Sequence, residues 1–290
     1  MTFKRIKFVT DSVADLSKEL TNKWDITVVP AFVNYGGNSY RDDGTELVRE
    51  EFYELLRTNP DIAPTSAAMS PGMAHEGIAE AFKRGADQVI IVTTPKELSG
   101  IYNSMRIAMQ DFPADQVTLI DSTQLSLGIA WQVLIGAEVA GETGDVEKTI
   151  AAIHSVRQHQ ATYAALATLE QLRRSGRVSG IVAGFGSLLD IKLIIQPLDG
   201  AVVPLTRVRT FKRALDKLAE LVQPYAPFDR LAVMHAINPE GAAALLDRLS
   251  DFLLPDTRVE PICPAIGVHG GPGIVGIAVV SKGWKNAIGA

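Results

Sequence analysis

Short apolar runs alternate with helical patterns through the first half of this chain, and this alternation restricts the fold more than any other feature. Three of the runs end in hydroxyl and carboxyl side chains: residues 6–9 before Thr10-Asp11-Ser12, residues 89–92 before Thr93-Thr94, and residues 117–120 before Asp121-Ser122-Thr123. Strands separated by helices form a parallel, doubly wound sheet, whose ligands bind at the carboxyl ends of the strands. The first half therefore predicts a parallel sheet flanked by helices, with a polar rim that suits a ligand. Simple capping of the next helices explains Asp11 and Asp121 equally well.

Turn and capping signals predict the other elements of the first half. Two glycine-containing turns indicate a hairpin-like excursion over residues 34–44, and residues 63–66 indicate a loop. Ser70 and Pro71 suit the cap and the first position of a helix. We expect a further strand at residues 26–33 and helices at residues 15–24, 46–57 (capped by Thr45), 71–84, 99–111 and 125–141.

The second half predicts another α/β unit. Thr168 and Gln171 form a capping box before a short helix that ends at Ser175-Gly176. The expected strands are residues 163–167, 201–206, 230–236, 257–262 and 274–280, and the expected helices are residues 146–159, 209–222 and 239–253. We place the domain boundary between residues 1–160 and 161–290, although no Pro-, Gly- or Ser-rich linker marks it.

Composition indicates a globular protein with a sizeable core, because 47% of the 290 residues are hydrophobic and 21% are charged. The longest uncharged stretch, residues 261–281, contains glycines, prolines and His269, so it predicts strand, loop and strand rather than a membrane span. The basic residues near the N-terminus lead directly into a strand, unlike a signal peptide. The single cysteine, Cys263, excludes an internal disulfide, and no histidines have metal-ligand spacing. We expect a cytoplasmic protein without a metal site.

Charge is distributed unevenly along the chain. Acidic residues outnumber basic ones over residues 1–155, and the reverse holds over residues 156–290. No Lys- or Arg-rich run is interleaved with aromatic residues, which argues against a nucleic-acid partner. The second half instead suits an anionic protein surface, although helix ends in solvent explain the same residues. Its basic clusters are Arg173-Arg174 with Arg177, Arg207 with Arg209, and Lys212-Arg213.

Two segments stand out as candidate binding sites. Ser99 and Gly100 follow a buried strand at the start of a helix, where free backbone N–H groups suit a carboxylate or phosphate. The segment His269-Gly270-Gly271-Pro272-Gly273 predicts an unusual loop whose imidazole can donate to an anion. A simple helix cap and an incidental histidine in a tight turn are the alternatives. No nucleophile elbow, Walker loop, zinc motif or dinucleotide fingerprint occurs, which favours binding over catalysis.

Seven short motifs occur in an order that resembles the DegV family, which includes the fatty-acid-binding subunit of bacterial fatty acid kinase. The motifs are Thr10-Asp11-Ser12, Pro64-Thr65-Ser66, residues 98–104 (LSGIYNS), Asp121-Ser122, Gly176-Arg177-Val178, Arg209-Thr210 and His269-Gly270-Gly271-Pro272-Gly273. Each motif is weak alone, but together they span nearly the whole chain.

The resemblance implies two α/β domains, the first with a parallel sheet and the second mixed, holding one long-chain fatty acid in a tunnel between them. It implies that Thr65, Ser99 and His269 meet the carboxylate, with Ser66 and Gly100 beside them. It also implies no catalytic residue, cofactor or metal in this chain, because a separate ATP-dependent kinase subunit phosphorylates the bound acid for phospholipid synthesis. Arg177 and Arg209 are the kinase-docking residues that the resemblance implies.

Departures from the family pattern fall at Ile101, where a threonine is common, and at Gly270, another position where threonine is frequent. Both changes remove a hydroxyl near the head group without removing an implied ligand. The apolar walls that we expect for a tunnel serve equally well as ordinary core: Ile101, Met105, Leu125, Leu188, Leu189, Ile194, Ile195 and Ile266.

Other function classes remain open on sequence grounds. A serine-dependent lipid hydrolase or acyltransferase would use Ser99 as nucleophile and His269 as base, with Asp11 or Asp121 orienting the histidine. The missing nucleophile elbow weighs against it. A small-ligand sensor without a kinase partner is the third hypothesis.

Overall fold

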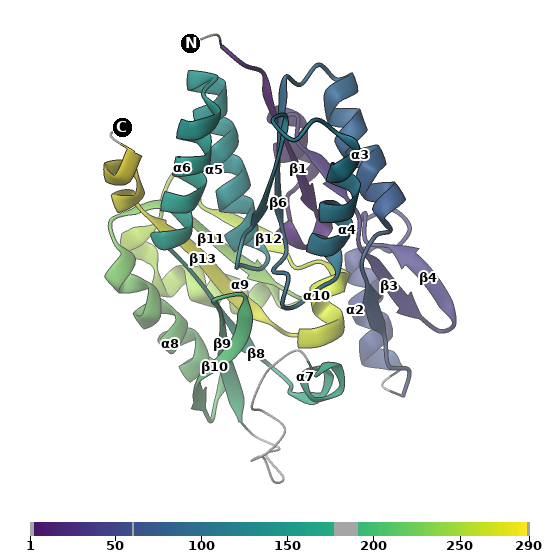
Figure 1. Ribbon diagram of the computed structural model, residues 1–290. Helices are drawn as coiled ribbons and strands as arrows, with labels where there is room; N and C mark the ends of the chain where they lie inside the picture. Colours follow the sequence, from purple (N-terminus) through teal and green to yellow (C-terminus); the bar gives the residue numbers. More distant parts are fainter. Residues whose placement is uncertain (1–2, 60, 177–190, 289–290) are drawn as a thin grey trace.

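The protein is built in five layers (Figure 1). The computed structural model describes residues 3–59, 61–176 and 191–288. Helices α3 (Pro71–Lys83) and α4 (Ile101–Ala108) cover one face of a four-stranded sheet, and α5 (Leu127–Thr143) covers the other face. Beyond α5 lies a six-stranded sheet, whose far face is covered by α8 (Phe211–Val222) and α9 (Pro239–Arg248).

The four-stranded sheet is parallel, as the sequence predicts. Its strand order is β2 (Thr27–Val29), β1 (Ile6–Asp11), β6 (Gln88–Thr93), β7 (Val117–Asp121). Every residue of β6 is buried, which is typical of a central parallel strand covered on both faces. Ser70 caps α3 by accepting a hydrogen bond from the backbone of Met73, 3.2 Å away, so the predicted start of that helix is confirmed.

Helix α5 packs against both sheets, and nearly all of its residues are therefore buried. Its Trp131 indole donates to the carbonyl of Ala278 in the six-stranded sheet, at 3.3 Å. Helix α6 (Val146–Gln158) packs beside α5 and leads into β8 (Gln160–Leu166). The predicted division into residues 1–160 and 161–290 falls at this connection and stays a prediction.

The six-stranded sheet is mixed. Its strand order is β10 (Ala201–Val208), β9 (Lys192–Leu198), β8, β13 (Val275–Ser281), β11 (Phe228–His235), β12 (Arg258–Pro261). All neighbours are antiparallel except β11 and β12. Strand β9 is absent from the strands that the sequence predicts, and its Pro197 is unusual in a strand. The signal that was available is Asp199-Gly200, because both residues have positive φ in the β9–β10 hairpin turn.

The predicted strand at residues 26–33 is wrong as a single strand. Pro30 separates β2 from β3 (Phe32–Tyr35), and β3 belongs to a separate three-stranded sheet. There β3 pairs with β4 (Asn38–Arg41), which confirms the predicted hairpin. Its other neighbour is β5 (Thr65–Ala67), within a segment that the sequence analysis takes as a loop.

Several predicted helix starts shift. Helix α2 (Arg49–Thr58) begins after Val48, because the Thr45 hydroxyl instead donates to Asp43 within its own turn, at 2.6 Å. Helix α1 (Lys18–Lys23) is shorter than predicted, since Ser17 caps it. In α7 (Glu170–Ser175) the cap position is Leu169 rather than Thr168.

Candidate functional site

A cavity of about 190 Å³ lies between the two large sheets. One water needs only about 10–15 Å³, so the cavity has room for an elongated organic molecule. Its wall comes from β5, the β6–α4 segment, the start of α5, strands β8 and β9, and helix α10 (Pro264–Gly270). Most of the lining side chains are apolar, among them Leu98, Leu125, Ile195, Ile262, Ile266 and Ile274.

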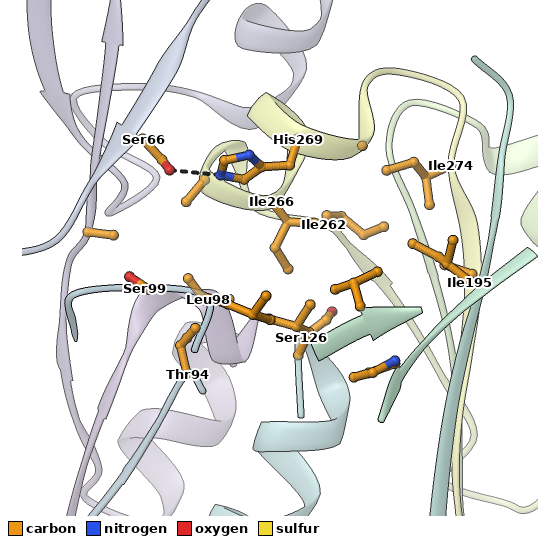
Figure 2. A pocket seen from close by; sticks show the side chains of 18 of the residues that line it. Ser66, Thr94, Leu98, Ser99, Ser126, Ile195, Ile262, Ile266, His269 and Ile274 are labelled. Atoms are coloured by element: carbon orange, nitrogen blue, oxygen red, sulfur yellow. Dashed lines mark hydrogen bonds between the residues drawn. The ribbon is translucent and has the colours of Figure 1, made fainter. Parts of the chain in front are cut away.

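Hydroxyl and imidazole groups gather at one end of this cavity. Ser66 Oγ lies 2.8 Å from His269 Nε2, and Ser99 lies close by (Figure 2). Ile195 and Ile274 lie at the opposite side of the view. The cavity therefore has a polar end and an apolar end.

Thr65 does not line the cavity, whereas Ser66 does. Successive side chains of a strand point to opposite faces, so only one of these two neighbours in β5 can point toward His269. Thr65 is exposed, and its hydroxyl oxygen accepts a hydrogen bond from Asn34 Nδ2 at 3.2 Å. The structure thus brings Ser66, Ser99 and His269 together and leaves Thr65 outside.

Ser99 keeps its hydroxyl proton available. Its Oγ accepts a hydrogen bond from the backbone N–H of Ile101 at 3.3 Å, which leaves the O–H free to donate. Helix α4 begins at Ile101, two residues later than predicted, with Gly100 as its cap. Gly100 lines the cavity too, and a Cβ there would only touch Ala68 at an ordinary 3.5 Å.

Two further hydroxyls in the cavity wall, those of Thr94 and Ser126, donate their hydrogen bonds to buried carboxylates. Thr94 Oγ1 donates to Asp11 at 2.8 Å, and Ser126 Oγ donates to Asp15 at 2.5 Å. A hydroxyl has one proton, so each presents only lone pairs to the cavity. No sequence motif indicates a role for Ser126, because its partner Asp15 is 111 residues away in the chain.

Ser126 also has a strained backbone, with φ 52° and ψ −134°. A residue other than glycine costs about 1–3 kcal/mol in such a region and persists only where its surroundings hold it. The hydrogen bond to Asp15 is one such restraint.

Burial has the largest effect on the pKa values of the Asp11 and Asp15 carboxyl groups. It raises the pKa of Asp11 to about 6, although hydrogen bonds from Thr94 and Val13 favour the charged form. Burial likewise raises the pKa of Asp15 to about 6 against the opposing effect of Arg49. Near neutral pH both groups are therefore mostly ionised and act as acceptors.

The residues proposed to orient a catalytic histidine have other partners. Both oxygens of Asp11 accept hydrogen bonds from Thr94, and Oδ1 also accepts from Val13. Asp121 accepts from the backbone N–H groups of Lys96 and Thr123.

His269 lies in the last turn of α10 rather than in a loop, which corrects the sequence analysis. The glycines that suggested a loop follow the helix: Gly271 and Gly273 have φ of 78° and 84°. The start of α10 is held from below, because Asp15 accepts from the backbone N–H of Cys263 at 2.8 Å and Tyr53 Oη donates to the Cys263 carbonyl at 3.1 Å. These contacts fix the helix that carries the imidazole.

The other expected residues are distributed as follows. Ile101, Leu125, Ile195 and Ile266 line the cavity, whereas Met105 and Ile194 are core residues outside it. Arg209 is exposed after β10, directly before Thr210, the cap of α8. Arg177, Leu188 and Leu189 lie outside the described residues.

Among the helices that the structure describes, none has the length and apolar character required to cross a membrane. Within residues 3–59, 61–176 and 191–288, no group of three His, Cys, Asp or Glu side chains is arranged to hold a metal ion.

These features define a class: α/β proteins that enclose a mostly apolar cavity, polar at one end, between a parallel and a mixed sheet. The chain belongs to the DegV family. The family model described as "Uncharacterised protein, DegV family" matches residues 5–282, so the resemblance noted in the sequence is confirmed.

Relatives match over nearly their whole length. A DegV domain-containing protein of Streptomyces coelicolor is 31% identical over 284 residues, covering 96% of this chain and 99% of the relative. The structure of a fatty-acid-binding DegV family protein from Thermus thermophilus matches with a TM-score of 0.87 and 30% identity, covering 96% of this chain and 99% of that one. DegV from Bacillus subtilis, described as a fatty acid binding protein, matches at 0.84 and 28%, covering 96% and 100%.

Proposed function

We propose that this protein binds one long-chain fatty acid in the cavity and presents its carboxylate to a separate, ATP-dependent fatty acid kinase. The observation that carries the proposal is the placement of Ser66, Ser99 and His269 at one end of a mostly apolar cavity. The Thermus thermophilus relative, at 30% identity over nearly the full chain, supports a fatty acid as the ligand.

The apolar wall supplies most of the binding free energy. Burial of a methylene contributes about 0.8 kcal/mol, so an acyl chain of about 15 methylenes supplies about 12 kcal/mol before ordering costs. Neutral donors are then sufficient for the head group, and no lysine or arginine has to contact it.

The head-group donors work as a short relay. With a proton on Nε2, His269 donates to Ser66 Oγ, and the Ser66 hydroxyl then donates to the ligand carboxylate. Ser99 donates from the other side, beside the Gly100 backbone. Ser66 takes the role that the family resemblance gives to Thr65, because the Thr65 hydroxyl is bonded to Asn34 outside the cavity.

The kinase supplies ATP, metal and phosphoryl transfer, so this chain acts as a cytoplasmic carrier without a cofactor or catalytic residue of its own. Arg177 and the exposed Arg209 are the proposed docking residues on the basic second half. The acyl phosphate product serves phospholipid synthesis. The two proposed domains, residues 1–160 and 161–290, would enclose the ligand between them.

Native mass spectrometry of the purified protein, followed by lipid extraction, tests the ligand. We expect one co-purifying long-chain fatty acid per chain. Protein that is empty and also fails to take up added oleate or palmitate would overturn the proposal. For docking, Arg209→Ala should weaken association with the kinase and leave lipid binding unchanged.

A serine-dependent hydrolase or acyltransferase is the second candidate, because the distance of 2.8 Å between Ser66 and His269 is that of a nucleophile and its base. The sequence motifs indicate Ser99 as the nucleophile of such an enzyme, whereas this distance favours Ser66. Covalent labelling of either serine by a phosphonate would support an enzyme, and no labelling would favour the carrier.

A further inference from the structure

Four elements of the first half, β3, β4, α2 and β5, form one unit beside α10 (Figure 1). Strand β3 pairs with both β4 and β5, and Tyr35 of β3 ties α2 to this sheet by donating from Oη to the Leu55 carbonyl at 3.4 Å. Strand β5 carries Ser66, whose Oγ lies 2.8 Å from His269 Nε2. The unit therefore carries one partner of that hydrogen bond, and α10 carries the other.

Two side chains of α2 hold the backbone at the start of α10. Tyr53 is buried, and its Oη donates to the carbonyl groups of Ile262 and Cys263 at 3.2 and 3.1 Å. Arg49 lies four residues earlier, on the same face of α2, and its guanidinium donates to the carbonyl of Pro261. One face of α2 thus supplies donors to three consecutive carbonyl groups.

Asp42, in the connection from β4 to α2, holds the same part of α10. Its Oδ2 accepts hydrogen bonds from the backbone N–H of Ala265 at 3.4 Å and from the Ser12 hydroxyl at 3.1 Å. The carboxylate is buried, so these donors stabilise it where water cannot. The unit therefore fixes the start of α10 through backbone carbonyl groups and through a backbone N–H group.

Tyr53 also contacts α10 close to His269. A Cβ at Gly267 would lie 2.5 Å from both Cε1 and Oη of Tyr53, closer than a side chain can approach. Glycine at this position, two residues before His269, therefore lets the tyrosine ring lie directly against the helix backbone. Because α10 has seven residues, about two turns, a displacement of its start moves the imidazole as well.

We infer that Tyr53 is a positioning residue for fatty acid binding, supported by Arg49 and Asp42. Its hydroxyl holds α10 against the unit that carries Ser66, and this contact sets the distance between His269 Nε2 and Ser66 Oγ. Tyr53 does not line the cavity, so it acts through His269. The inference rests on the proposed fatty-acid binding and adds the residue that orders its donors.

A double-mutant cycle between Tyr53→Phe and Ser66→Ala tests this role. Phenylalanine keeps the ring against Gly267 and removes only the hydroxyl. Stearate affinity is measured by displacement of a fluorescent fatty acid. We expect Tyr53→Phe to weaken binding about three- to tenfold, because His269 no longer orients Ser66 fully. Ser66→Ala should then weaken binding about tenfold in the wild type but only about threefold in Tyr53→Phe.

Tyr35→Phe is the matched control. It is the same substitution in the same unit, but the hydroxyl that it removes donates to Leu55 of α2 instead of to α10. It should change neither the stearate affinity nor the effect of Ser66→Ala. A second measurement needs no ligand: the ¹⁵N signal of His269 Nε2, assigned by its loss in His269→Gln, should move in Tyr53→Phe and stay in place in Tyr35→Phe.

Additive losses in the cycle, or a His269 signal that stays in place in Tyr53→Phe, would overturn the positioning role. Tyr53 would then contribute to folding stability alone. Failure of the proposed function gives a different result, because stearate itself would not bind to the wild type. The imidazole signal is read without stearate, so it decides separately whether Tyr53 positions His269.

Discussion

Two groups of hydroxyls face the same cavity, and they differ in the acceptor to which each hydroxyl donates its hydrogen bond. At the polar end, Ser66 and Ser99 can donate to a ligand. Further along the wall, Thr94 and Ser126 donate to the buried carboxylates Asp11 and Asp15, so they present only acceptors. A fatty acid carboxylate needs donors, and the groups behind the wall therefore decide at which end it binds. The number of hydroxyls alone says little about this choice.

The largest expected effect tests the carboxylate behind Ser126. Asp15→Asn should lower the free energy of unfolding by about 1–3 kcal/mol, because an amide has one acceptor oxygen for the two buried donors, Ser126 Oγ and the Cys263 N–H, that the two carboxylate oxygens of Asp15 now accept. Asparagine suits the positive φ of 55° at this position, so backbone strain does not confuse the result. Urea unfolding measures the change.

Asp87→Asn is the control for that variant, since Asp87 pairs with Arg5 at the exposed surface and should matter little. An equal, small loss in both variants would mean that the hydrogen bonds to Asp15 do not hold Ser126 and Cys263.

The pH dependence of stability examines the other carboxylate. Burial raises the pKa of Asp11 from 3.8 to about 6, so the folded protein binds this proton more tightly than the unfolded chain. Stability from this group is therefore complete below about pH 4 and is lost as the pH rises through about 6. The loss from pH values below 4 to neutral pH amounts to about 3 kcal/mol, because each tenfold difference in proton affinity corresponds to about 1.4 kcal/mol and the pKa differs by about two units.

Asp11→Asn isolates this contribution, because asparagine does not titrate. The free energy of unfolding of the wild type, relative to that of the variant, should fall between pH 4 and pH 7. A difference that stays constant over this interval would contradict a raised pKa for Asp11.

Removal of one hydroxyl from each group should affect different properties: fatty acid affinity for the donor end and folding stability for the acceptor wall. Ser99→Ala should weaken fatty acid binding about ten- to hundredfold, because a donor to a charged group contributes about 1.5–3 kcal/mol. Thr94→Val should leave that affinity unchanged and lower the free energy of unfolding by about 1–2 kcal/mol, because Asp11 loses a buried donor.

Fluorescent displacement and urea unfolding on both variants measure the two quantities. Equal losses of affinity in Ser99→Ala and Thr94→Val would erase the distinction between the donor end and the acceptor wall.

Sequence patterns revealed one of these groups better than the other. The apolar runs and the residues after them predict the parallel sheet, and short motifs led to Ser99 and His269. Those signals are local, because each residue lies next in sequence to the end of a strand or to a helix terminus. The acceptor wall depends on contacts such as Ser126 with Asp15, 111 residues apart, and on a positive φ at a serine. No local pattern encodes either feature.

Strand assignment also decided which residue of the Thr65-Ser66 pair faces the ligand. Residues 63–66 contain a proline and carry no apolar alternation, so the sequence indicates a loop and gives neither side chain a direction. Pairing with β3 makes residues 65–67 a strand, and the alternation of side chains then follows. The strand β3 is itself seen only once Pro30 is recognised as the break between two sheets.

The smallest expected effect distinguishes Thr65 from its neighbour Ser66 as the donor to the ligand. Ser66→Ala should weaken fatty acid binding about tenfold, since it removes one donor to the charged carboxylate, worth about 1.5 kcal/mol at the low end of the range. Thr65→Val should leave the affinity unchanged, because its hydroxyl bonds Asn34 outside the cavity. Displacement titrations of both variants give the answer. If Thr65→Val weakens binding and Ser66→Ala does not, the strand presents the opposite face to the ligand, and the donor set has to be reassigned to Thr65, Ser99 and His269.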